Sequence, residues 1–167
     1  MDEVATNCDY IGLTDDRLKH MRQVGERCIE IAEKLRGTPL PLEEQKRWFL
    51  TGFLHDVGYR FSIHQKEHPT VGAHMLHVLY LTDEITIPIS EHGRPGIPNL
   101  MKNTVILNIA DMTTSSDGKK VAYEERMTGI EERYGKDSEQ YVEAEQVWTE
   151  CAKWIAKNTE ISSIDEL

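Results

Sequence analysis

Residues 48–59 read WFLTGFLHDVGY, a segment that is apolar nearly all round a helical axis. A helix with this pattern is buried on most of its sides. His55 and Asp56 stand near its end, and a buried carboxylate is costly unless it is paired or coordinates a metal. We therefore expect a core helix that starts near Pro41, runs to Gly58 and carries two polar side chains to a buried site.

Two other predicted helices show the same conflict between apolar pattern and polar residue. At 100° per residue, His20 falls at the edge of the apolar stripe of a helix at residues 14–37. In the segment 103–113, NTVILNIADMT, Asp111 interrupts an apolar run. Imidazole and carboxylate donors together suit Mn, Fe, Zn or Mg, whereas the alternative for the carboxylates is a helix-terminal or core hydrogen-bond network. The candidate ligands are His20, His55, Asp56 and Asp111.

Residues that typically begin or end helices recur along the chain, and no segment shows a convincing strand pattern. Thr14 is a predicted N-cap and Gly37 a predicted helix end, and Pro69 stands at the start of a further helix. Residues 83–93 are predicted to form a short helix, which Pro88 could interrupt. The other predicted helices are one of about 15 residues at 99–113, one closed by Gly135, and a last one at 137–157 with a capping box at Asp137 and Gln140. The sequence predicts an all-α fold of six to seven helices.

Composition and charge favour one ordinary globular domain over residues 1–167, with a core at about 14–135 and an acidic C-terminal helix at about 137–157. The net charge of −10 argues against nucleic acid or an anionic membrane as partner. Residues 124–167 hold 12 acidic and 5 basic side chains, so the first 123 residues, with every candidate site, are near neutral and can accept an anionic substrate. No secretory signal or membrane span is visible, and the cysteines form no CxxC pair, which predicts a reduced cytoplasmic protein. These cysteines are Cys8, Cys28 and Cys151.

Six of the seven histidines fall within 38 residues. Such a cluster favours a metal site, although a single histidine is more often a surface or core residue. His74 and His77 are three residues apart on a predicted helix and could chelate an ion, but amphipathic helix edges also produce such pairs by chance. The six are His55, His64, His68, His74, His77 and His92.

The order His20, His55-Asp56, Asp111 resembles the HD-domain metal-dependent phosphohydrolase superfamily, over roughly residues 14–135. Residues 68–76, HPTVGAHML, are similar to the HPxxGAxxL element of its dinuclear branch, and EHGRP at 91–95 is similar to the segment with the later histidine. That branch includes bacterial HD-type dinucleoside tetraphosphate hydrolases and HD-GYP cyclic-dinucleotide phosphodiesterases. The resemblance implies that His68 and His92 bind a second metal ion, with Asp56 bridging the two ions.

The chain departs from these relatives at three points. Tyr59, followed by Arg60, stands where many relatives have Lys three residues after the Asp of the HD pair. The GYP triplet is missing, and the acidic pair of stringent-response hydrolases is not visible after the HD pair. These departures weigh against cyclic-dinucleotide hydrolysis and leave the substrate open.

The resemblance implies hydrolysis of a phosphate ester or anhydride by a metal-activated water, with His55 and Asp56 as catalytic residues. Its implied cofactor is a divalent metal, two ions, with Fe or Mn foremost and Mg, Co, Zn or Ni as alternatives. The expected partner is a small phosphorylated substrate such as a nucleotide. Trp148 and Trp154 favour a role in the core, although they leave room for a homodimer or partner surface. Candidate phosphate contacts are Arg60, Arg94, Lys119 and Lys120. The alternatives are a metal-stabilised regulatory domain that binds a nucleotide or a protein, and a di-iron oxygenase of the same fold.

Overall fold

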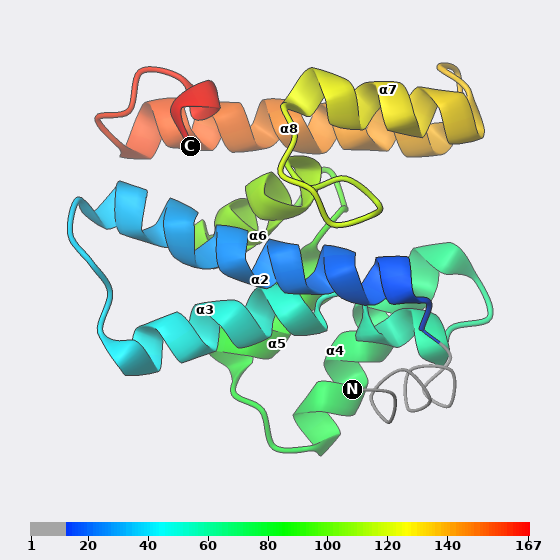
Figure 1. The fold of residues 1–167 in the computed structure, drawn as a ribbon, viewed down its shortest axis with the longest axis horizontal. Coiled ribbons are helices and arrows are strands. Elements are labelled where there is room, and N and C mark those ends of the chain that lie inside the picture. The colour runs from blue at the N-terminus through cyan, green and yellow to red at the C-terminus, as the bar shows by residue number, and fades with distance from the viewer. Residues whose placement is uncertain (1–12) are drawn as a thin grey trace.

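The computed structural model describes residues 13–167, which contain seven α-helices and no strand (Figure 1). This confirms the predicted all-α fold. Cys8 and the N-terminal segment considered for a signal sequence lie outside the described residues. The helices are α2 (Asp15–Arg36), α3 (Leu42–Leu54), α4 (His68–Val78), α5 (Asp83–Glu91), α6 (Lys102–Met112), α7 (Tyr123–Tyr134) and α8 (Glu139–Asn158). Three short 3-10 turns complete the described chain: η1 (Val57–Arg60) and η2 (Gln65–Glu67) between α3 and α4, and η3 (Ile164–Glu166) after α8.

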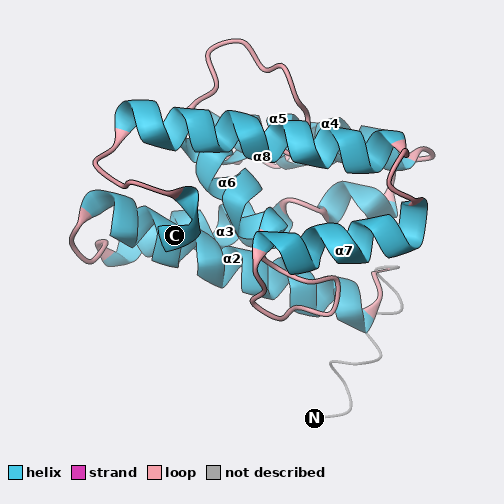
Figure 2. Cartoon of the chain, turned by 90° about the horizontal axis from the view of Figure 1, so that it is seen from above, coloured by secondary structure: helices cyan, strands magenta, loops and turns pink. Residues whose placement is uncertain are grey.

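Helix α6 lies at the centre of the molecule, between α8 on one side and α2 on the other (Figure 1; Figure 2). Its side chains Val105, Ile106, Leu107 and Ile109 are fully removed from solvent. Helices α2 and α3 pack against each other on one side of α6, and α7 and α8 form an antiparallel pair on the other. Burial on all sides explains why the α6 sequence is apolar almost throughout.

The ends of α2 follow the predicted capping chemistry. The Thr14 hydroxyl accepts a hydrogen bond from the backbone N–H of Arg17, and Gly37 ends the helix in the left-handed conformation at φ 75°. Further along, Gly25 of α2 meets Gly52 of α3 so closely that a Cβ at Gly52 would lie 2.6 Å from the Gly25 Cα. This backbone contact sets how near α3, and the residues that follow it, come to α2.

Helix α3 ends earlier than predicted, at Leu54, so that His55 is its C-cap and Asp56 lies beyond it. The chain then tightens into η1, because Gly58 passes directly against the start of α4. A Cβ at Gly58 would lie 1.9 Å from the backbone oxygen of His68, which leaves room for glycine alone. His68 is the first residue of α4, so the helix begins one residue before the predicted start at Pro69.

Two further helix boundaries differ from the prediction, whereas the short helix predicted around Pro88 is present and unbroken. Helix α5 continues through Pro88, and the Glu84 carbonyl that Pro88 cannot bond accepts instead from Asn103 Nδ2 at 3.4 Å. Helix α6 has 11 residues rather than about 15. Ser138, not Asp137, caps α8, because its hydroxyl accepts from the Tyr141 backbone N–H.

Helix α8 packs against the core through Val147, Cys151 and Ile155. Trp148 and Trp154 are partly buried against the same core, and Trp148 stacks on Tyr123 with ring centroids 4.3 Å apart. Within residues 13–167, none of the helices has the length and apolar character needed to cross a bilayer.

Candidate metal centre

The structure brings all six candidate ligands together in one cluster. Each comes from a different position in the chain, mostly from a helix end, so the site depends on the packing of five helices. His55 is fully buried and Asp56 is only 3% exposed. The contributions are His20 from α2, His55 and Asp56 from the end of α3, His68 from the start of α4, His92 from the C-cap of α5 and Asp111 from α6.

Backbone carbonyls orient three of the four imidazoles. Nδ1 of His20 lies 2.9 Å from the Ser115 carbonyl, Nδ1 of His55 lies 2.6 Å from that of Gly52, and Nδ1 of His92 lies 2.7 Å from that of Ile89. A carbonyl can only accept, so in each case Nδ1–H donates, and Nε2 is the ring nitrogen that faces the site. This arrangement is typical of metal-binding histidines.

Asp56 lies between two sets of ligands. Its Oδ1 is 3.1 Å from His68 Nε2, 3.3 Å from His55 Nε2 and 3.7 Å from His92 Nε2. Its Oδ2 faces the opposite side, 3.8 Å from His20 Nε2 and 2.5 Å from Arg17 Nη1. One carboxylate therefore offers an oxygen to each half of the cluster.

Asp111 completes the half that contains His20. Its Oδ1 lies 3.1 Å from His20 Nε2 and 3.9 Å from His55 Nε2. On its outer side the same oxygen receives Arg126 Nη2 at 3.3 Å. In the other half, the Nε2 atoms of His68 and His92 are 3.1 Å apart.

The cluster keeps both carboxylates ionised. Burial by itself would raise the pKa of Asp56, but His55, His68 and His92 together hold that pKa well below its usual range. Burial likewise opposes ionisation of Asp111, while the hydrogen bond from His20 and the charge of Arg126 lower its pKa. The pKa of His92 is lowered, chiefly by burial, which favours the neutral ring that a metal requires.

The donor set fits a divalent metal. The His55 Nε2 atom is buried and has no hydrogen-bond partner among the described residues, although Asp56 Oδ1 is near, and an orphaned buried nitrogen is unusual in a folded protein. Ligand atoms lie within 4.8 Å of one another in two overlapping groups, which share His55. The groups are His20, His55 and Asp111, and His55, Asp56 and His92.

The cluster forms the floor of a cavity of about 820 Å³. His68, His92 and Asp111 line it directly, together with two tyrosines, Tyr59 and Tyr134. Five cationic side chains also line it: Arg17, Lys66, Arg94, Arg126 and Arg133. The site therefore combines metal-binding donors with a positively charged wall, a combination suited to a phosphate group.

Of the four predicted phosphate contacts, the structure brings only Arg94 to the cavity. Arg60 is exposed and lies over Phe61, Lys119 pairs with Asp117, and Lys120 pairs with Glu30. The other four cationic side chains of the cavity were not predicted from the sequence: Arg17, Lys66, Arg126 and Arg133. The histidines outside the cluster, His64, His74 and His77, are exposed.

In the sequence, only helical spacing connects Arg17 and the two α7 arginines with the site. Arg17 stands three residues before His20, one helical turn away on the same face, and Arg126 and Arg133 are seven residues apart, two turns along one face. Exposed helices carry such spacings by chance, so the pattern alone does not distinguish a cavity wall from a solvated surface.

Comparison with known proteins gives one match. A protein-family model described as HD domain matches residues 17–134, most of the chain and all six residues of the cluster. Searches of the curated proteins and of the solved structures found nothing that matches.

Proposed function

Because the chain belongs to the HD-domain family, we propose that it is a metal-dependent phosphohydrolase that cleaves a phosphate ester or anhydride of a nucleotide or another small phosphorylated metabolite. One observation carries the proposal: four imidazoles and two carboxylates meet at the floor of a cavity whose wall is cationic. Metal ligands without the charged wall would suit many reactions, whereas the two together suit phosphate.

We propose two ions. The first is held by His20, His55, Asp56 and Asp111, and the second by Asp56, His68 and His92. The supporting observation is the position of Asp56, whose two oxygens face the two halves of the cluster. Fe and Mn agree best with the mixed nitrogen and oxygen donors, and Mg, Co, Zn and Ni are the alternatives.

When bound, a divalent ion lowers the pKa of a water molecule and stabilises charge on phosphate oxygens. The protein's own side chains hold and orient the reactants. The Nδ1 protons of His20, His55 and His92 are fixed by backbone carbonyls, so these rings act as ligands and do not relay protons. Arg17 and Arg126 reach the two carboxylates of the cluster and can each present a planar pair of N–H groups to a phosphate beside it.

A screen of phosphate release tests the proposal. The full chain is incubated with nucleotides, dinucleotides and sugar phosphates, with Mn, Fe, Co and Mg supplied in turn, and each reaction is repeated with a chelator. We expect metal-dependent release from at least one class of compound. Release from none of them, or equal release with the chelator, would contradict the proposal, and substrate-dependent oxygen uptake by an iron-loaded sample would favour the di-iron oxygenase instead.

Asp56→Asn is the matching variant, because it keeps the shape of the side chain and removes the charge that both halves of the cluster share. We predict that phosphate release falls to the level of the chelated wild type and that metal content per chain falls as well. Elemental analysis and thermal unfolding of the same sample distinguish a folded, metal-poor protein from a misfolded one. Full metal content with normal turnover in Asp56→Asn would show that Asp56 has another role.

A further inference from the structure

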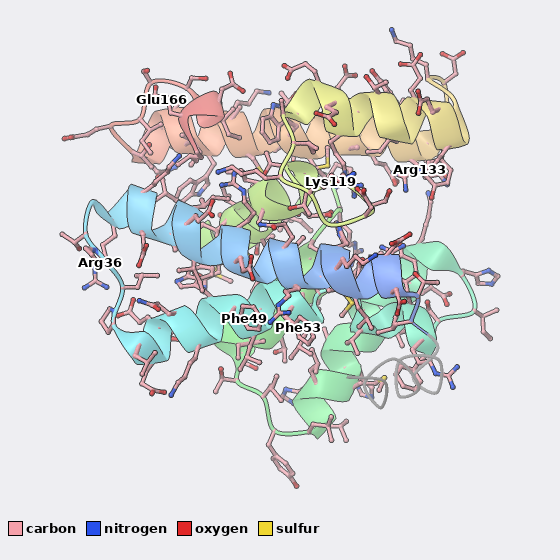
Figure 3. All side chains as sticks on the ribbon, viewed as in Figure 1. Arg36, Phe49, Phe53, Lys119, Arg133 and Glu166 are labelled. Atoms are coloured by element: carbon pink, nitrogen blue, oxygen red, sulfur yellow. The ribbon has the colours of Figure 1, made fainter. Side chains whose placement is uncertain are left out.

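Helix α7 presents two arginines to the cavity. Arg126 and Arg133 are seven residues apart, which places them on one face and separates their Cα atoms by about 10 Å along the helix. Arg126 lies at the metal cluster, where Nη2 contacts Asp111 Oδ1 at 3.3 Å. Arg133 is farther out, and Figure 3 shows it near the end of α7, on the side that faces the other helices.

Neither arginine has its full set of hydrogen-bond or ion-pair partners within residues 13–167. The Nε of Arg126 is buried and has no hydrogen-bond partner within the described part of the chain. Arg133 Nε donates to the Gly129 carbonyl, and its guanidinium lies over the Tyr134 ring, but it forms no ion pair with residues 13–167. An orphaned buried donor and an unpaired guanidinium at one cavity indicate that an anion from outside is missing.

The surrounding charge supports this reading. The chain as a whole carries −10, yet the cavity is lined by five cationic side chains against three carboxylates, Glu67, Asp111 and Glu143. Some of these charges pair with each other, Asp111 with Arg126 and Glu143 with Lys66, whereas Arg94 and Arg133 of the wall form no ion pair with residues 13–167. Arg133 is an exposed residue, and partial desolvation together with the nearby charges of Arg126 and Arg17 lowers its pKa, so the three cations repel one another in the absence of an anion.

We propose that Arg126 and Arg133 form an oligophosphate subsite beside the metal cluster, so that the substrate carries two or more linked phosphate groups. This inference rests on the proposed function, since the group to be cleaved lies at the metal cluster. A phosphate there can contact Arg17 and Arg126, but it leaves Arg133, two turns farther along α7, without an anion. A second phosphate linked to the first extends along α7 and reaches Arg133.

The test compares two probes that the protein cannot hydrolyse. Methylphosphonate carries one anionic group and methylenediphosphonate carries two that are linked. Their dissociation constants are measured by calorimetry on the full, metal-loaded chain, with the same metal ion in cell and syringe so that chelation by the probe is equal for all variants. Arg133→Gln removes one charge from the subsite, and Lys136→Gln is the matched control, because Lys136 is exposed just beyond α7 and does not line the cavity.

In the wild type we expect methylenediphosphonate to bind at least about tenfold more tightly than methylphosphonate, which corresponds to one additional charge-assisted contact. Arg133→Gln should weaken the diphosphonate about tenfold and the methylphosphonate less than about twofold, while Lys136→Gln changes neither by more than about twofold. Equal affinity of the wild type for both probes, or equal losses in the two variants, would overturn the inference.

The outcome for the subsite is separate from that for the proposed function. If metal-dependent phosphate release occurs but the diphosphonate has no advantage, the hydrolase remains and the subsite is wrong. If Arg133 discriminates between the probes and no substrate is turned over, the subsite remains and the hydrolase is wrong.

Discussion

Tyr59 lies between a guanidinium and an imidazole. The Arg17 guanidinium carbon is 4.3 Å from the centre of the Tyr59 ring, and the His68 ring stacks on Tyr59 with a centroid distance of 3.9 Å and an interplanar angle of 16°. Burial raises the pKa of Tyr59, so its hydroxyl stays protonated at neutral pH. At the position where many relatives have Lys, this chain thus has an aromatic ring that supports a candidate ligand and holds an arginine beside the cluster.

We predict that Tyr59→Ala weakens metal binding, because His68 and Arg17 both lose the surface that orients them. Loss of such a supporting contact typically costs about 10–100-fold in metal affinity. The measurement is a titration of the chelated protein with Mn or Co, followed by elemental analysis. Tyr59→Phe, which keeps the ring, should bind metal like the wild type, and equal affinities for Tyr59→Ala and Tyr59→Phe would contradict the role assigned to the ring.

Among the structural elements, the loop between α6 and α7 has a direct connection to the cluster. Its Ser115 carbonyl accepts from His20 Nδ1, and the Ser115 hydroxyl contacts Asp117 at 2.5 Å. Gly118 has φ 81° and packs against α2, where a Cβ would lie 2.6 Å from the Lys19 carbonyl carbon. The loop therefore positions His20 only while residue 118 has no side chain.

Gly118→Ala should destabilise the protein by about 2–4 kcal/mol, because it combines left-handed strain with a clash against backbone. Gly96→Ala is the control: Gly96 has φ 74°, but its Cβ would meet nothing within 4 Å, so it carries the strain alone, about 1–2 kcal/mol. Urea unfolding gives both values, and metal titration reports on His20. Equal losses of stability in the two variants, with unchanged metal affinity, would show that the loop does not position His20.

Several elements could be predicted from the sequence because their signals are local. The Thr14 cap, the glycines that end α2 and α7, and the absence of strands from residues 13–167 needed no tertiary information. The end of α3 could not be predicted in this way, because it depends on a tertiary contact: the backbone of Gly58 packs directly against that of His68 at the start of α4. The capping residue of α8 is Ser138 rather than the predicted Asp137, because both adjacent residues are good N-caps and the pattern alone does not decide between them.

The candidate ligands could be predicted because each one breaks an apolar pattern or belongs to a motif of the resemblance. The cationic wall could not. In sequence, Arg126 and Arg133 belong to an acidic C-terminal region that was expected to lie outside the site, and an arginine on an exposed helix has no pattern to break. Only the position of α7 beside the cluster, with Arg126 against Asp111, shows that these charges line a cavity.

At the scale of the whole molecule, the fold depends on a cluster that is poorly satisfied without an ion. Five helices and η1 meet at six polar residues, one of which has an orphaned buried nitrogen. An ion that binds only the folded state stabilises it by mass action, by about 2.7 kcal/mol at a concentration 100 times the dissociation constant. Metal binding and folding stability are therefore expected to be linked.

We predict that chelation lowers the melting temperature of the wild type by about 5–10 °C, given about 2–4 °C per kcal/mol for a chain of this size. Thermal unfolding with and without chelator measures the shift, and re-addition of metal after chelation should restore it. Asp56→Asn, which lacks the shared ligand, should show a much smaller shift. An identical melting temperature with and without chelator would mean that the cluster is stable without an ion.

The most direct measurement of the central claim is the number of metal ions per chain in the wild type and in the double variant His68→Ala/His92→Ala. If Asp56 joins two metal sites, elemental analysis should give two ions for the wild type and one for the variant, which keeps His20, His55, Asp56 and Asp111. Most of the phosphate release should be lost with the second ion. The same ion count in both proteins, with similar rates of release, would contradict the two-metal centre.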